Sequence, residues 1–123
     1  MIFSSENAQK ILAGTKTQTR RLVKSDKPRY KIGHVYAFSD GRRKKALGYI
    51  EIVGVRSENL GEISYDDCIA EGIDGIYQWA MMTMMERFKE LWDNIHKEKG
   101  NRFEDNPLIW MYEFRLVRRG NGK

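Results

Sequence analysis

In the first third of the chain, the spacing of apolar residues changes from helical before Gly14 to strand-like after it. Residues 5–13 place their apolar side chains at helical spacing, behind two serines that suit a helix N-cap, and predict a short helix. Gly14 stands where a left-handed residue would end that helix. Residues 17–23 are rich in threonine and end in Leu-Val, and residues 34–39 alternate apolar and mixed positions. Both of these segments are predicted to be strands.

The second part of the chain continues as a strand and then becomes helical. Residues 44–60 are predicted to form one long, glycine-interrupted strand or a bent pair of strands, with Gly48 and Gly54 expected to mark bulges. Residues 64–72 carry a Ser-x-x-Asp capping pattern and a terminal glycine, which predict a short helix. A longer amphipathic helix is expected over 76–99, with Asp74 as its cap and an apolar stripe of Tyr77, Met81, Met84, Phe88, Leu91, Trp92 and Ile95. Residues 106–117 are apolar on both alternating faces, which favours a central strand.

This order of elements, a helix, several strands, two helices and a strand, predicts an α+β fold. Several short strands that close on themselves suggest a small β-barrel, with the helices packed at one side. With 123 residues and no visible boundary, we expect one domain over 1–117 and a basic flexible tail over 118–123.

Composition narrows the function classes. The chain has one cysteine and two distant histidines, Cys68, His34 and His96, so we expect no disulfide, no metal site and no cofactor. Cys68 is interpreted as a small buried side chain. No apolar run approaches the ~20 residues that span a membrane. We therefore expect a soluble cytoplasmic protein without a membrane partner, and we favour a monomer.

Positive charge is concentrated in one part of the chain. Residues 16–45 hold eleven Lys or Arg against two Asp, a local charge of +9, while the whole chain carries +5 and the remainder therefore −4. Such segregation attracts polyanions, and it favours RNA or a nucleotide as the partner. A solvated basic surface is the alternative explanation.

The sequence GTKTQTRR, residues 14–21, gathers candidate chemistry behind one glycine. Lys16 and Thr19 would point to opposite faces of a regular strand, so they converge only if Lys16 belongs to the preceding loop. Arg21 shares a face with Thr19 and is a candidate clamp for a carboxylate, a phosphate or a base edge. Arg20 is a second candidate ligand contact, although we expect it to face solvent.

The sequence DGRRKK, residues 40–45, is a second binding candidate. A hairpin tip with consecutive cations suits contacts to phosphates, and a solubilising turn is the alternative. Tyr36 is a candidate for stacking on an unpaired base. The candidate phosphate contacts of this tip are Arg42, Arg43, Lys44 and Lys45.

Four stretches in the predicted order resemble the ASCH domain family, within the PUA-like superfamily. ILAGTKTQTRR resembles its Gly-x-Lys-x-x-Thr-x-Arg signature, and YKIGHVYAF resembles its second strand. SYDDCIAEGI is similar to its short helix that ends in Glu-Gly, and NPLIWMYEFRLV to its closing strand. The resemblance spans residues 2–117, and it implies a PUA-like barrel that acts on RNA or nucleotides.

Some small bacterial members of that family are amidohydrolases that remove the acetyl group from N(4)-acetylcytidine with a lysine, a threonine and a glutamate. By motif, these residues fall on Lys16, Thr19 and Glu71. The resemblance implies Thr19 as nucleophile, Glu71 as acid and base towards the cytosine amine, and Lys16 as either base or oxyanion stabiliser.

The leading hypothesis is a cleft, between barrel and helices, that recognises RNA or a modified nucleoside. The amidohydrolase is the alternative. A ribonuclease is a weaker third hypothesis, because no pair of histidines is available for general acid–base catalysis. Binding of another protein through the methionine-rich helix is the fourth.

Overall fold

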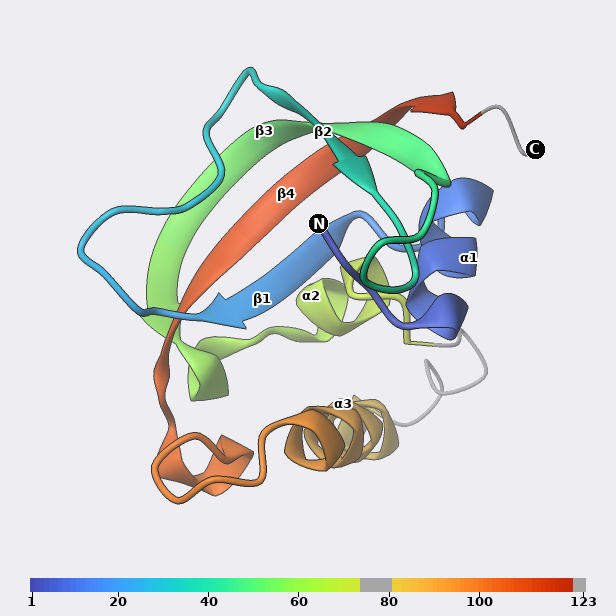
Figure 1. Ribbon diagram of the computed structural model, residues 1–123. Coiled ribbons are helices and arrows are strands. Elements are labelled where there is room, and N and C mark those ends of the chain that lie inside the picture. Colours follow the sequence, from blue (N-terminus) through green and yellow to red (C-terminus); the bar gives the residue numbers. More distant parts are fainter. Residues whose placement is uncertain (74–80, 121–123) are drawn as a thin grey trace.

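A computed structural model describes residues 1–73 and 81–120, with the backbone alone for residues 81–83. Along the chain, one helix precedes three consecutive strands, and helical segments then separate these from the last strand (Figure 1). The elements are α1 (Ser5–Ala13), β1 (Gln18–Leu22), β2 (Val35–Phe38), β3 (Gly48–Asn59), η1 (Leu60–Glu62), α2 (Tyr65–Ala70), α3 (Met81–Ile95), η3 (Phe103–Asp105) and β4 (Leu108–Arg119). This confirms the predicted α+β class. The expected cap Asp74 and the start of the long helix lie outside the described residues.

The four strands form one antiparallel sheet in the order β1-β4-β3-β2. β4 is central, as its two apolar faces predicted, and β1 is an edge strand. The register of β3 against β4 shifts between Ile52 and Gly54, which confirms a bulge at the second glycine of the long strand. The sheet is strongly bent (Figure 1).

The N-terminal segment lies between the two edge strands. Ile2 forms a parallel bridge with Ser39, next to the end of β2, and Phe3 N donates to Ser39 O at 3.0 Å. On the other side, the guanidinium of Arg21 in β1 donates to Ile2 O at 3.0 Å. The N-terminal segment therefore contacts both edge strands of the sheet and links β1 to the end of β2.

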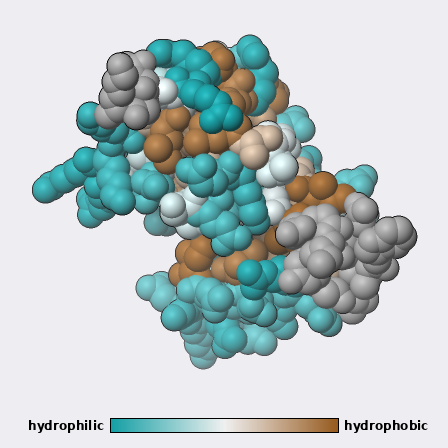
Figure 2. Space-filling model, turned by 90° about the vertical axis from the view of Figure 1, so that its right-hand side faces the viewer, coloured by the Kyte–Doolittle hydropathy of each residue, from teal (hydrophilic) through white to brown (hydrophobic). Residues whose placement is uncertain are grey.

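The two faces of β4 contribute to two hydrophobic cores. Tyr112 and Phe114 belong to the first core, which α1 and the N-terminal segment cover. Ile109 and Met111 belong to the second core, which α2 and α3 cover. Hydrophobic atoms gather where the α3 layer meets the rest of the molecule, while its outer surface is hydrophilic (Figure 2). β1 runs along the boundary between these two layers, which places the functional candidates there.

Local sequence signals explain the ends of the two short helices. Ser4 accepts from Asn7 N and caps α1, and Gly14 ends it with φ of +81°. Ser64 and Asp67 form the predicted capping box of α2. Gly72 follows α2 with φ of +98°, a conformation that favours glycine.

Helix α3 carries most of the expected apolar stripe. Met84, Phe88 and Trp92 are buried in the second core. Ile95 was expected on the same stripe, but it ends the helix and is 70% exposed. Tyr77 lies outside the described residues. Within the described part of the chain, no helix is long and apolar enough to cross a membrane.

Candidate functional site

The loop before β1 brings Lys16 to the end of α2. β1 begins at Gln18, so Lys16 lies in the loop, as its convergence with Thr19 required. Thr17 N donates to Ala70 O at 2.8 Å and attaches this loop to the last turn of α2. A Cβ atom on Gly72 would lie 3.2 Å from Lys16 Cβ, so the glycine leaves room for the lysine.

Lys16 and Glu71 form a buried ion pair. Lys16 Nζ donates to the backbone oxygen of Glu71 at 2.9 Å and to its carboxylate Oε1 at 3.2 Å. Burial lowers the pKa of Lys16, and the charge and hydrogen bond of Glu71 oppose this shift only in part. The net direction is downward, which favours the neutral amine relative to an exposed lysine.

Arg20 is buried, and the expectation that it faces solvent is wrong. Its guanidinium, with a side-chain exposure of 0%, donates to Glu71 Oε2 and Gln18 Oε1 at 2.8 and 2.9 Å. It also lies 3.1 Å from Asp67 Oδ2 and 3.5 Å from Glu58 Oε2, as ion pairs without hydrogen-bond geometry. Because α2 and β3 converge on this face of β1, three carboxylates surround one cation.

Two features complete this carboxylate cluster. Burial opposes ionisation of Asp67, but the hydrogen bond from the backbone of Ser64 and the charge of Arg20 hold its pKa below the usual range. Arg56, whose side chain is 50% exposed, approaches Glu58 and Asp67 from the solvent side. Sequence reasoning identified Asp67 only as a helix cap and missed Glu58, because neither shares a motif with Arg20.

Lys16, Thr19 and Glu71 line one cavity of about 460 Å³, which we call the Lys16 cavity. Side chains from both faces of β1 reach it, since β1 is an edge strand. Its polar wall includes Lys16, Thr19, Arg20, Arg21 and Glu71, and its apolar wall includes Phe3, Ile73, Phe88, Leu91 and Trp92. The structure therefore brings together the three residues that the family signature selects.

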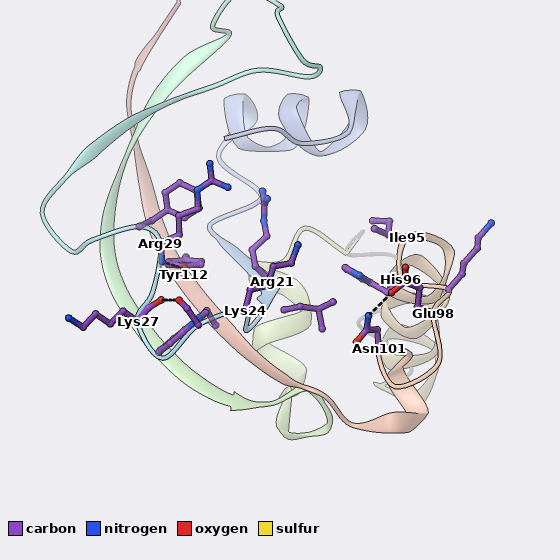
Figure 3. A pocket seen from close by; sticks show the side chains of 14 residues that line it. Arg21, Lys24, Lys27, Arg29, Ile95, His96, Glu98, Asn101 and Tyr112 are labelled. Atoms are coloured by element: carbon purple, nitrogen blue, oxygen red, sulfur yellow. Dashed lines mark hydrogen bonds between the residues drawn. The ribbon is translucent and has the colours of Figure 1, made fainter.

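A second cavity of about 500 Å³ adjoins the first, and we call it the Lys24 cavity. The two cavities share Arg21, Ile95 and His96. The Lys24 cavity lies between the sheet side of the molecule and the C-terminal end of α3, with Arg21 and Lys24 opposite His96 and Asn101 (Figure 3). Arg21 is half-buried, and burial lowers its pKa.

The remaining candidates lie outside both cavities. The hairpin tip, Arg42 to Lys45, is exposed between β2 and β3. Tyr36 is half-buried beside Tyr30, and its hydroxyl accepts from Lys31 N at 2.9 Å. Cys68 is a buried free thiol, as predicted, and burial raises its pKa to about 11. Among the described residues, no group of three His, Cys, Asp or Glu side chains is arranged to hold a metal ion.

The chain belongs to the ASCH domain family, whose model matches residues 1–118. Solved structures share its fold. A protein from Enterococcus faecalis V583 is 19% identical with a TM-score of 0.68, over 96% of this chain and 74% of that one. An ASCH domain from Lactobacillus crispatus JV V101 is 20% identical with a TM-score of 0.62, and the match covers 93% of this chain and 72% of that one. ASCH from Zymomonas mobilis is 10% identical with a TM-score of 0.60, and the match covers 98% of this chain and 71% of that one.

No curated protein sequence matches this chain. At these identities the structural neighbours establish the fold, and the arguments for function come from the residues of this chain.

Proposed function

We propose that the Lys16 cavity binds the base of a nucleoside or of an RNA nucleotide. The observation that carries this proposal is that the Lys16 cavity has both a polar wall and an apolar, aromatic wall. Lys16, Thr19 and Glu71 offer donors and acceptors on one side, and Phe88 and Trp92 offer apolar ring surface on the other. A nucleobase has a polar edge and two apolar faces, so both walls find a counterpart. The local excess of positive charge near β1 also suits such a ligand.

Calorimetric titration with cytidine, N(4)-acetylcytidine and a short single-stranded RNA tests this proposal. We expect measurable binding, and a loss of at least about tenfold for Glu71→Gln, which removes the charge of one buried hydrogen-bonding group while keeping its shape. Arg43→Gln, on the exposed hairpin tip, is the matched control and should leave nucleoside affinity unchanged. Binding of no nucleoside and no RNA, or equal affinity in Glu71→Gln, would contradict the proposal.

A second candidate function, amide hydrolysis of an N-acylated cytosine, is favoured by the hydrogen bonds of Lys16 and by the burial that lowers its pKa, and the proposed reaction starts from its neutral amine. A neutral amine that donates both hydrogens to Glu71 keeps its lone pair at the third tetrahedral position. In the proposed reaction this lone pair takes the hydroxyl proton of Thr19, and Thr19 Oγ1 attacks the acyl carbon. The bond from that carbon to the cytosine nitrogen then breaks.

The proton balance runs through Glu71. Lys16 passes the proton to Glu71 Oε1, and Glu71 delivers it to the departing cytosine amine. Lys16 then takes a proton from water, whose oxygen attacks the acyl carbon of the acyl-threonine ester. The ester bond to Thr19 Oγ1 breaks, Lys16 returns the proton to Oγ1, and acetic acid leaves. Arg20 holds Glu71 Oε2 at 2.8 Å and acts as a positioning residue in this scheme.

Turnover of N(4)-acetylcytidine, followed as cytidine by chromatography, tests the hydrolase. Thr19→Ala and Lys16→Ala are each expected to lose at least about 100-fold in kcat/KM, the usual contribution of a nucleophile or general base. Since the neutral amine is the active form, kcat/KM should rise with pH through the lowered pKa of Lys16. Turnover that survives in Thr19→Ala would exclude this mechanism and leave base binding as the function.

A further inference from the structure

The Lys24 cavity is lined by cations that form no ion pair with any acidic side chain in the described part of the chain. Five of its lining residues are positively charged, and one, Glu98, is negatively charged. Its cations are Arg21, Lys24, Lys27, Arg29 and Lys97. Within the described residues, none of these five forms an ion pair. Their charges are therefore available to an external anion.

The same cavity has an aromatic and partly enclosed floor. Tyr30 and Tyr112 line it with their rings at 77° and 5.3 Å, and Trp110 lines it as well. The guanidinium of Arg29 lies 5.5 Å from the centre of the Tyr30 ring. Tyr112 Oη accepts from Arg29 N at 3.1 Å, which holds the backbone of this loop against β4. Lysines and arginines around such a floor suit a phosphate group with a sugar or base beside it.

His96 lies where the two cavities meet. It lines both, and its ring centre is 4.0 Å from that of Trp92. Burial lowers the pKa of His96, and the charges of Lys24 and Arg21 lower it further, while Asp93 opposes them. The pKa of His96 is therefore sensitive to the positive potential of this region, and an anion bound beside His96 would raise that pKa again.

From these observations we propose that the Lys24 cavity is a phosphate subsite, and that the ligand of this protein is a phosphorylated nucleoside unit. The inference rests on the proposed function, since the base of that unit occupies the adjoining Lys16 cavity. Arg21, shared by both cavities, lies between the base and the phosphate. A free nucleoside would leave the five cations unused, whereas a nucleotide or an RNA strand engages them.

Affinities for cytidine and cytidine 5′-monophosphate test this subsite, because neither compound has an acyl group to lose. The monophosphate should bind at least about tenfold more tightly, the effect of one charge-assisted hydrogen bond. The double variant Lys24→Gln, Arg29→Gln should abolish that gain and leave cytidine affinity unchanged. The matched control, Arg43→Gln with Lys89→Gln, removes the same charge outside both cavities and should keep the gain.

Inorganic phosphate separates failure of the subsite from failure of the base site. Followed by nuclear magnetic resonance, phosphate should raise the pKa of His96 and leave His34, which lines neither cavity, unchanged. If phosphate shifts His96 but no nucleoside binds, the base site fails and the phosphate subsite stands. If cytidine binds and its monophosphate binds no better, the subsite is refuted. The absence of both the His96 shift and nucleotide binding refutes it as well.

A short RNA distinguishes the two sources of the phosphate. A dinucleotide that binds more tightly than the monophosphate, and loses this advantage in the Lys24→Gln, Arg29→Gln variant, would assign the subsite to a polynucleotide chain. Equal affinity would assign it to a free nucleotide.

Discussion

The molecule holds its cations in two contrasting environments around the same strand. Lys16 and Arg20 are buried, and every charge they carry is opposed by a carboxylate within 3.5 Å. Apart from the half-buried Arg21, the cations of the Lys24 cavity and of the hairpin tip are exposed to water. Lys44, for example, contacts Asp40 only at 3.8 Å. Burial therefore gives the first group carboxylate partners within the protein, whereas the exposed cations of the second group can meet an external anion.

Burial also explains why the two groups differ in energy. Removing a buried ion from its partners leaves charges that water cannot reach, which costs about 3–5 kcal/mol. An exposed pair contributes about 0–1 kcal/mol, because water competes with both partners. Arg20 and Arg56 offer a direct comparison, since both contact Glu58 and Asp67, one from inside and one from solvent.

The largest expected effect is on stability. Arg20→Met should lower the free energy of unfolding by about 3–5 kcal/mol, because three carboxylates lose their shared cation. Arg56→Gln, the matched control, should lower it by no more than about 1 kcal/mol. Urea unfolding followed by circular dichroism measures both. Equal losses in the two variants would show that burial does not separate these arginines.

A smaller effect should follow from the pKa of Lys16. That pKa is lowered in the folded protein from 10.5 in a free lysine, so above the folded value the unfolded chain binds a proton that the folded chain lacks. Folding stability therefore rises with pH between the two values, by at most about 1.4 kcal/mol per pH unit.

Lys16→Met provides the reference for this effect. The free energy of unfolding of the natural chain, minus that of Lys16→Met, is expected to increase from neutral pH towards the ordinary lysine pKa of 10.5. Urea titrations at several pH values measure it. A difference that stays constant or falls with rising pH would mean that the pKa of Lys16 is not lowered.

The sequence predicted most reliably what neighbouring residues decide. The capping box of Ser64 and Asp67, the glycine after each short helix and the loop position of Lys16 all follow from local rules. The family signature also predicted that Lys16 lies close to Glu71. The hydrogen bond from Thr17 N to Ala70 O explains this contact, because it attaches the loop of Lys16 to the end of α2.

The sequence failed where distant segments converge. Arg20 was placed in solvent because alternation along an isolated strand cannot show that α2 and β3 cover its outer face. The Lys24 cavity was missed because its walls come from the connector after β1 and from the end of α3, and neither carries a motif. Ile95 followed the apolar period of α3 but lies at its last residue, beyond the second core.

The hairpin tip should give the smallest effect, and only on association with RNA. Neutralising Arg42, Arg43, Lys44 and Lys45 together should leave the free energy of unfolding within about 0.5 kcal/mol, since these side chains are exposed. If all four bind phosphates, the plot of log affinity for single-stranded RNA against log salt should flatten by about 0.7 for each cation neutralised. Fluorescence anisotropy at several salt concentrations measures the slope. An unchanged slope would assign the tip to solubility alone, and the Lys24 cavity would then carry the phosphate contacts of any bound strand.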